Sequence, residues 1–281
     1  MTPKQMNMDI ASTTTLNNDL EMPWLGLGVF QSKEGNEVIN AVKVALDCGY
    51  RSIDTAAIYH NERGVGQAIG ESSVPREAIF LTSKVWNSEQ GYESTMKAFE
   101  ESLEKLKTEY LDLYLIHWPK GRKSVKTWKA MEELYKKGRI KAIGVSNFLV
   151  HHLEDFLPEC KVVPAVNQVE FHPTLIQPDL LEFCRNKGIQ LEAWSPIMKG
   201  KVNDLPVLQA LAAKYGKTPV QVTLRWEIQK GVVTIPKSVT NKRIVDNADI
   251  FDFELSSEDM DKIDRLDKNQ RIGPHPDHIS F

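Results

Sequence analysis

The stretch LDLYLIHWPKGRKSVKTWKAMEELYKKGRIKAIGVS, residues 111–146, shows the pattern from which the rest of the chain is built. Residues 111–117 are rich in Leu, Ile and Tyr and predict a buried strand, and residues 140–146 predict a second one. Between them, apolar side chains recur at a helical spacing and give one apolar stripe: Trp128, Met131 and Leu134. The stretch is therefore expected to form a βαβ unit.

The same alternation of strand and helix extends in both directions along the chain. The remaining strand candidates are, in chain order, residues 51–54, 79–85, 165–170, 190–195, 232–237 and, more weakly, 250–253. Glycines suited to end a helix precede several of these strands: Gly49, Gly138, Gly188 and Gly231. Thr218 and Pro219 predict the N-cap and first residue of a further helix.

Successive strand ends lie about thirty residues apart, which is the length of one βα unit. Eight such units predict an α/β fold, a closed parallel (β/α)8 TIM barrel, although an open doubly wound sheet would share much of the pattern. Residues 13–22 differ, because short β-prone runs flank the turn at residues 17–19 and predict an N-terminal β-hairpin. No linker or low-complexity stretch divides the chain, so we expect a single domain over residues 1–281.

Composition excludes several classes of protein. The net charge of -3 gives no reason to expect nucleic acid or an anionic membrane as a partner. No segment is apolar enough to span a bilayer and no signal peptide is visible, so a cytoplasmic location is expected. Three cysteines, Cys48, Cys160 and Cys184, lack metal-ligand spacing and are interpreted as free, buried or semi-buried thiols.

Two weaker signals are interpreted as structural. The glycines of residues 64–70 approach a dinucleotide-binding fingerprint, but their spacing and their distance from the preceding strand are wrong, so they predict a helix packing face. The pairs His151-His152 and His275/His278 lack further ligands at a suitable spacing for zinc. We therefore expect solvated histidines and no metal.

Four polar side chains fall at or just after the ends of the first three predicted strands that follow the hairpin: Asp54, Tyr59, Lys84 and His117. The carboxyl ends of barrel strands meet at one rim, where active sites of this architecture lie. Each residue also has an ordinary explanation, as a cap, a packed ring, a solvated charge or a core histidine. Four successive positions with compatible chemistry favour a site.

The physical scheme is proton delivery to an oxygen. A Tyr hydroxyl has an ordinary pKa of about 10, and a neighbouring ammonium such as Lys84 is expected to lower the pKa of Tyr59 by about 1–3 units. Asp54 would keep Lys84 charged, since a buried ammonium without a partner tends to lose its proton. His117 would bind and orient the substrate oxygen.

The sequence resembles the aldo-keto reductases. The segments that carry the resemblance are residues 26–30, 49–59, 82–86, 113–119, 144–148 and 235–238, in the family's order and approximate spacing. The similarity is closest to short-looped bacterial members that reduce 2-oxoaldehydes such as glyoxal and methylglyoxal, the type that includes 2,5-diketo-gluconate reductases. The resemblance implies NADPH-dependent reduction of small aldehydes, 2-oxoaldehydes and ketones, with Tyr59 as general acid.

The resemblance also implies a set of cofactor-binding residues. Those expected at the nicotinamide are Ser146, Asn147 and Gln168 on its carboxamide and Trp194 on its ring. Those expected along the pyrophosphate are Ser195, Pro196 and Met198. Those expected on the 2′-phosphate and adenine are Lys237, Ser238, Arg243, Asp246 and Asn247. Gly28, Val29 and Val239 complete the set. Lys237 and Arg243 could instead be a solvated basic helix start, but only the phosphate distinguishes NADP from NAD, and Arg can bind it bidentately.

The substrate pocket is expected to be lined by aromatic rings, beside Tyr59 and His117: Phe30, Trp86 and Trp118. Phe30 stands where many family members have Trp or Tyr. The loop after His117 and the tail after Asp267 are short, so we expect an open pocket for a small-molecule carbonyl. The family is often monomeric, which favours a monomer here.

Two other functions compete with reduction. Lys84 could form a Schiff base in an aldolase-like barrel, which would leave Tyr59 and the basic residues without a role. Alternatively the barrel could sense the cofactor with negligible turnover, like potassium-channel β-subunits, which the intact set of four residues argues against.

Overall fold

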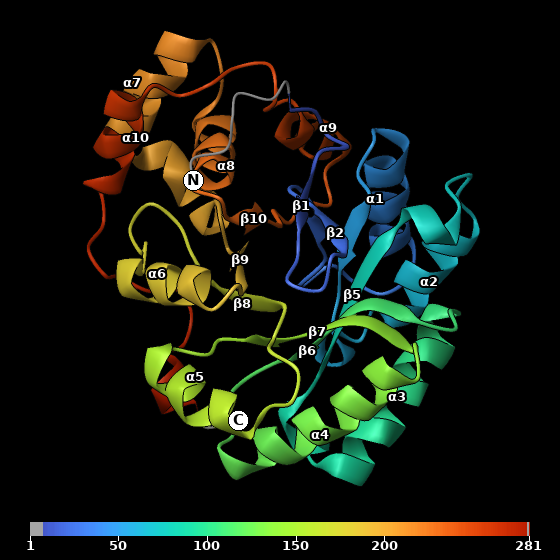
Figure 1. The fold of residues 1–281 in the computed structure, drawn as a ribbon. Helices are drawn as coiled ribbons and strands as arrows, with labels where there is room; N and C mark the ends of the chain where they lie inside the picture. The colour runs from blue at the N-terminus through green and yellow to red at the C-terminus, as the bar shows by residue number, and fades with distance from the viewer. Residues whose placement is uncertain (1–7, 280) are drawn as a thin grey trace.

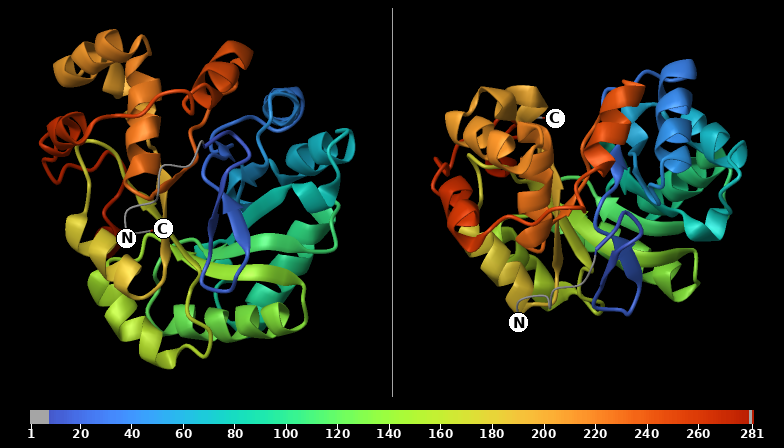
Figure 2. Two further views of the ribbon diagram at one scale, coloured as in Figure 1. Left: turned by 45° about the horizontal axis from the view of Figure 1, so that its top comes forward. Right: turned by 90° about the horizontal axis from the view of Figure 1, so that it is seen from above.

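The computed structural model describes residues 8–279 and 281, and its centre is a closed ring of eight parallel strands (Figures 1 and 2). In chain order these are β3 (Leu27–Gly28), β4 (Ser52–Asp54), β5 (Phe80–Val85), β6 (Leu111–Ile116), β7 (Ile140–Ser146), β8 (Val166–Glu170), β9 (Gln190–Trp194) and β10 (Val233–Thr234). Neighbours in sequence are neighbours in the sheet. The ring closes where the Gly26 amide donates to the Thr234 carbonyl at 2.9 Å. The predicted barrel is confirmed.

One predicted strand is wrong. Residues 250–253 form no strand, and the eighth strand is instead Leu27–Gly28, ahead of all the others. A strand of two residues is too short to show any periodicity, so β3 is recognisable only from its pairing with β4 and from the bridges Leu25–Thr234 and Gly28–Lys237. The apolar residues of the rejected segment pack inward: Ile250 is fully buried, and Phe253 lies 5.7 Å from the ring of Tyr215.

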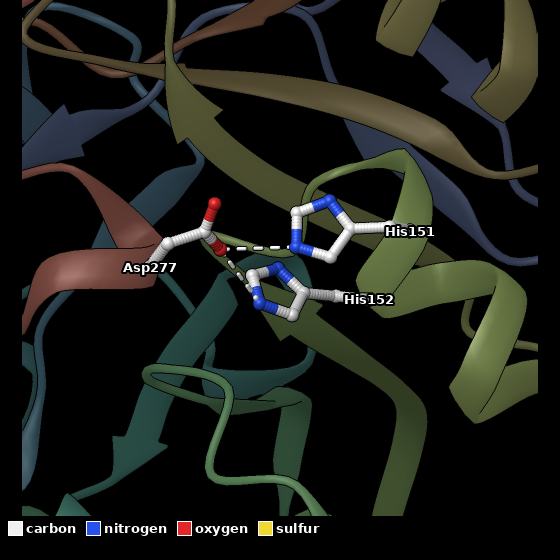
Figure 3. A group of neighbouring side chains, drawn as sticks. All are labelled: His151, His152 and Asp277. Carbon is white, nitrogen blue, oxygen red and sulfur yellow. Dashed lines mark hydrogen bonds and ion pairs between the residues drawn. The ribbon is translucent and has the colours of Figure 1, made fainter.

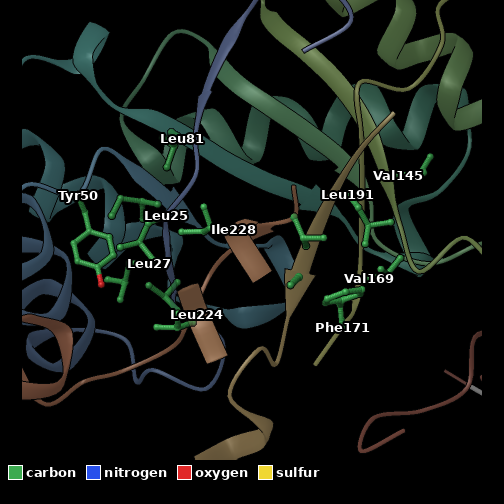
Figure 4. Packing of buried hydrophobic residues seen from close by; sticks show 14 of the residues in the cluster. Leu25, Leu27, Tyr50, Leu81, Val145, Val169, Phe171, Leu191, Leu224 and Ile228 are labelled. Carbon is green, nitrogen blue, oxygen red and sulfur yellow. The ribbon is translucent and has the colours of Figure 1, made fainter. Parts of the chain in front are cut away.

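Helices surround the strands (Figure 2). They are α1 (Asn36–Asp47), α2 (Glu62–Gly70), α3 (Tyr92–Leu106), α4 (Arg122–Lys136), α5 (Val150–Phe156), α6 (Pro178–Asn186), α7 (Pro206–Tyr215), α8 (Pro219–Gln229), α9 (Asn241–Ala248) and α10 (Ser257–Asp264). The apolar stripe predicted for α4 is buried. Thr218 caps α8 as predicted, because its Oγ1 accepts from the Gln221 amide at 3.2 Å. Side chains between strands and helices form the main core (Figure 4).

The predicted hairpin is present and covers one end of the barrel. β1 (Thr13–Thr15) pairs antiparallel with β2 (Glu21–Pro23). The buried side chains of Leu16 and Met22 form a second apolar cluster with the first residues of three barrel strands: Phe80, Val166 and Val233. The hairpin therefore plugs the amino-terminal end of the barrel, and only the opposite rim is free to bind a ligand.

Two further expectations can be compared with the structure. The three cysteines are unpaired and buried or half-buried, as expected, and burial raises the pKa of Cys160 and Cys184 to about 12. Within residues 8–279 and 281, no helix combines the length and apolar character needed to cross a membrane.

Two of the three glycines of α2, Gly64 and Gly66, serve helix packing as expected. A Cβ atom on Gly66 would lie 2.5 Å from the backbone carbonyl of Leu106 in α3. Gly66→Ala is therefore expected to destabilise the protein by about 1–3 kcal/mol through overpacking. Gly70, in the same helix, has open space at this position, so Gly70→Ala should be neutral or stabilising by up to about 1 kcal/mol. Urea denaturation measures both, and equal stabilities would contradict the close approach.

Candidate active site

The rim opposite the hairpin brings the four predicted residues together. Asp54 ends β4, Lys84 lies in β5, His117 follows β6, and Tyr59 ends a short 3-10 helix, η1 (Ala57–Tyr59). Lys84 Nζ lies 2.6 Å from Asp54 Oδ1 and donates to the Thr55 carbonyl at 2.9 Å. The same nitrogen is 5.1 Å from the centre of the Tyr59 ring, which lies 5.7 Å from the His117 ring.

The charges of Lys84 and His117 follow from their burial. Burial is the largest influence on the pKa of Lys84 and by itself would lower it, but Asp54, with Tyr59 and Glu192, raises the pKa above its ordinary value. Lys84 is therefore an ammonium. Burial, and then the Lys84 charge, hold the pKa of His117 well below its usual value. His117 is therefore a neutral imidazole at neutral pH.

The expected direction of the Tyr59 shift is not what this environment produces. Burial raises the pKa of Tyr59, and the Lys84 ammonium opposes that rise without reversing it. The sequence placed a cation beside the phenol, but it could not show how much water the fold removes from around a phenolate. Tyr59 is a phenol at neutral pH, which is the protonation state that a proton donor requires.

Glu192, which the sequence analysis did not identify, lies buried below this group. It belongs to β9 and has no exposed surface. The Gln168 side-chain amide donates one N–H to Asp54 Oδ2 at 2.8 Å and the other to Glu192 Oε2 at 2.7 Å. Both amide protons are thus used, and Gln168 Oε1 is the atom left to accept a hydrogen bond from a ligand. Burial, and then the Asp54 charge, raise the pKa of Glu192 to about 8.

Asn147, Ser146 and Trp194 are joined by hydrogen bonds at the next part of the rim. Trp194 Nε1 donates to Asn147 Oδ1 at 2.8 Å, and Asn147 Nδ2 donates to the His117 carbonyl at 2.9 Å. Ser146 Oγ donates to the Gln168 carbonyl at 2.8 Å. Asn147 has a positive φ of 65°, a conformation that Asn tolerates better than most residues. These bonds fix the half-exposed Trp194 ring, so Asn147 already has a structural role.

The loop after β9 is conformationally strained. Ser195 and Met198 both have positive φ, 54° and 53°, although neither is glycine. Such residues cost about 1–3 kcal/mol each and occur most often at functional sites. Pro196 lies between them and is buried. Ser195, Pro196 and Met198 are the residues that were expected along the pyrophosphate of the cofactor.

Lys237 and Arg243 flank the start of α9. Neither lies within 4 Å of a carboxylate among the described residues, whereas the neighbouring Lys242 is paired with Asp246 at 2.7 Å. Two cations without an acidic partner suit a phosphate group. The other expected residues here differ in exposure: Ser238 and Asn247 are buried, and Val239 is half-buried.

Gly28 and Val29 have structural explanations. A Cβ atom on Gly28 would lie 2.8 Å from the Ile235 carbonyl, so the barrel closure itself requires glycine. Val29 is fully buried in the main core. A ligand could reach only its backbone.

Aromatic rings line the mouth of the barrel, and one of them was not expected. Phe30 lies 5.0 Å from Tyr59, and Trp86 lies edge-on to His117 at 5.0 Å. Phe281, at the end of the chain, stacks on Trp86 with ring centres 5.5 Å apart and meets Trp118 edge-on at the same distance. The C-terminal tail therefore supplies one wall of the pocket. The short tail had instead been expected to leave the pocket open.

The tail is also fixed by polar contacts. The Phe281 carbonyl oxygen accepts hydrogen bonds from Asn87 at 3.0 Å and from Lys120 at 2.9 Å. No local pattern could indicate this wall, because the residues that meet are far apart in the sequence.

The C-terminal tail also brings Asp277 to His151 and His152, which thereby gain a carboxylate partner that the sequence did not suggest (Figure 3).

Comparison with known proteins identifies related sequences. A family model described as "Aldo/keto reductase family" matches residues 24–268. Glyoxal reductase from Bacillus subtilis is 59% identical over 276 residues, which cover 98% of this chain and 100% of that protein. Methylglyoxal reductase DkgA from Escherichia coli is 48% identical, over 92% of this chain and 94% of that protein.

Solved structures are similar over almost the whole chain. MGS-M4, an aldo-keto reductase from a Medee basin deep-sea metagenome library, superimposes with a TM-score of 0.94 at 47% identity, covering 96% of this chain and 100% of that one. A mutant of Gox0644 in complex with NADPH gives a TM-score of 0.91 at 44% identity, over 96% and 98% of the two chains.

The buried Glu192 leads to a prediction about stability. Folding raises its pKa from 4.5 to about 8, so the folded state holds the proton more tightly than the unfolded state. Stability contributed by this group is present at acidic pH and is lost as pH rises toward about 8. Glu192→Gln keeps an acceptor for Gln168 but cannot ionise.

The free energy of unfolding of Glu192→Gln, relative to the wild type, should therefore increase between pH 5 and pH 9. Urea denaturation at several pH values measures this difference. The other buried acids titrate in both proteins, so their contributions to the pH dependence cancel in the difference. A difference that does not change with pH would show that Glu192 is not protonated in the folded protein.

Proposed function

The chain belongs to the aldo/keto reductase family, and we propose that it uses NADPH to reduce small aldehydes, 2-oxoaldehydes and ketones to alcohols. The observation that carries the proposal is the buried Lys84–Asp54 pair, 2.6 Å apart, beside Tyr59 and His117 at the free rim of the barrel. The glyoxal and methylglyoxal reductases among the relatives support the substrate class.

Tyr59 supplies the proton in this reaction. NADPH, when bound, supplies the hydride that adds to the carbonyl carbon. The phenol protonates the carbonyl oxygen as negative charge develops there, and Lys84 stabilises the phenolate that Tyr59 becomes. Each pKa unit of stabilisation by the ammonium corresponds to about 1.4 kcal/mol. Asp54 keeps Lys84 charged and in position, and the neutral His117 orients the carbonyl oxygen.

The residues present fit the cofactor. Gln168 offers Oε1 to a carboxamide, because Asp54 and Glu192 accept both of its amide protons. Trp194 presents a half-exposed ring that is held by its bond to Asn147. Lys237 and Arg243 would hold the 2′-phosphate. The solved NADPH complex of the related protein supports this choice of cofactor.

The substrate would lie between Tyr59 and the aromatic wall. Apart from Tyr59 and His117, that wall consists of aromatic rings whose only polar groups are the two indole N–H groups: Phe30, Trp86, Trp118 and Phe281. Such a pocket favours small, flat carbonyl compounds that need few hydrogen bonds. A monomer of one domain remains our expectation.

The ion pair does not favour a Schiff-base mechanism. A lysine nucleophile must be an unprotonated amine, whereas the Asp54 carboxylate holds the pKa of Lys84 above its ordinary value. A cofactor sensor would keep the same fold, and the rate of turnover distinguishes it from a reductase.

Replacement of Tyr59 by Phe should remove the proton donor and leave the ring. We expect kcat for methylglyoxal reduction to fall by about 10²–10⁴-fold, while NADPH binding is retained. Tyr110→Phe is the matched control, because the Tyr110 hydroxyl is buried without a partner among the described residues and lies next to the start of β6, at the other end of the barrel. Steady-state NADPH oxidation and fluorescence titration measure the two effects. Turnover retained by Tyr59→Phe would refute this role.

Replacement of both Lys237 and Arg243 by Ala should weaken NADPH binding much more than NADH binding. Loss of two charge-assisted contacts is expected to raise the Kd for NADPH by more than about tenfold. Lys242→Ala is the control, because Lys242 is exposed and already paired with Asp246. Equal weakening of the two cofactors in the double variant would contradict a 2′-phosphate site.

A further inference from the structure

Two segments far apart in the sequence meet at the surface beside α5. His151 and His152 stand in the first turn of α5, and Asp277 belongs to a short 3-10 helix of the tail, η6 (Pro276–His278). Figure 3 shows both imidazole rings pointing toward the Asp277 carboxylate. His151 Nε2 lies 3.0 Å and His152 Nε2 lies 3.1 Å from the same oxygen, Asp277 Oδ1.

This convergence is unusual for adjacent residues of a helix. Side chains at i and i+1 normally point in different directions, so they do not face each other. Here the two ring centres are only 4.1 Å apart. One ligand atom from each of the three residues lies within 4.8 Å of the others. The three side chains therefore offer two imidazole nitrogens and one carboxylate oxygen to a single point.

The spacing of these donors is close to that of a metal site. Zn²⁺ binds His nitrogen at about 2.0–2.1 Å and carboxylate oxygen at about 2.0–2.2 Å, so neighbouring donors of a tetrahedral site are about 3.3 Å apart. The nitrogen-to-oxygen distances of 3.0 and 3.1 Å need to open only slightly. Two imidazoles and one carboxylate are donors that suit zinc, whereas Mg²⁺ prefers oxygen ligands alone.

Two further histidines are close by. His275 Nδ1 lies 3.8 Å from the second carboxylate oxygen, Asp277 Oδ2, and the His275 and His278 rings are 5.1 Å apart. Four of the seven histidines in the chain therefore gather within this small region. His275 Nδ1 already accepts from the Asp277 backbone amide at 3.3 Å, so a water molecule would complete the coordination.

We propose that His151, His152 and Asp277 form a binding site for a divalent transition-metal ion, Zn²⁺, which joins the C-terminal tail to α5. Binding at His152 requires a change of tautomer. The Leu149 amide donates to His152 Nδ1 at 3.1 Å, so the proton of the neutral ring lies on Nε2. On metal binding that proton moves to Nδ1, so Nε2 presents its lone pair to the ion and Nδ1 no longer accepts from the Leu149 amide.

The position of the site suggests what the ion does. Asp277 lies four positions before Phe281 in the chain, and the Phe281 ring forms a wall of the pocket against Trp86. An ion that holds Asp277 against α5 also fixes the chain close to Phe281 and favours the stacked position of the Phe281 ring on Trp86. The inference about the site itself does not depend on the proposed reduction, because metal binding is measured without substrate.

The test is calorimetric titration of Zn²⁺ into the full chain, prepared without an affinity tag and freed of metal with a chelator. We expect one ion per chain with a micromolar Kd, and no binding of Mg²⁺ under the same conditions. Asp277→Asn and the double variant His151→Gln/His152→Gln should each bind at least about tenfold more weakly. The melting temperature should rise with Zn²⁺ in the wild type and not in these variants.

Asp155→Asn is the matched control for Asp277→Asn, because Asp155 is an exposed acid of α5 that offers no donor to the group. It should bind Zn²⁺ like the wild type. An unchanged far-UV circular dichroism spectrum of all variants in the absence of metal would show that they are folded. Three results would overturn the proposal: no zinc binding by the wild type, equal affinity in Asp277→Asn, or an equal loss in Asp155→Asn.

Discussion

The ion pair between Lys84 and Asp54 is the interaction on which the site depends. An ammonium with no exposed surface is stable only beside a partner, and Asp54 lies 2.6 Å away. Removal of either residue would leave a buried charge alone, which costs more than the pair contributes. The pair also influences its neighbours, because the Lys84 charge adds to the effect of burial in lowering the pKa of His117 and limits the rise in the pKa of Tyr59.

A second buried carboxyl group extends this network. Gln168 connects Asp54 with Glu192, so the orientation of one side-chain amide is fixed from two sides. If Glu192 were ionised, the rim would hold two carboxylates for one ammonium. A protonated Glu192 avoids that repulsion and still accepts from Gln168. The hydrogen bonds of Gln168 therefore fix the geometry below the site, and the one ammonium, Lys84, faces the one carboxylate, Asp54.

The N-terminal hairpin and the C-terminal tail pack against opposite ends of the barrel. The N-terminal hairpin inserts Leu16 and Met22 into the amino-terminal end and makes that end part of the core. The C-terminal tail reaches the other end, where Phe281 packs on Trp86 and narrows the mouth. Between them, parallel strands direct each terminal side chain to the same rim. Binding is thus confined to one face of the molecule.

The sequence by itself determined the barrel, the hairpin and the positions of the four rim residues. Helical stripes, strand composition and capping residues are local signals, and parallel strands then bring their carboxyl ends together. Even so, local signals misplaced the eighth strand, because Leu27–Gly28 is too short to show a period. The tertiary structure decided the protonation states, since desolvation depends on every group packed around Tyr59 and Glu192. It alone also joined Phe281 to Trp86 and Asp277 to His151, because contacts across more than a hundred residues leave no mark on local sequence.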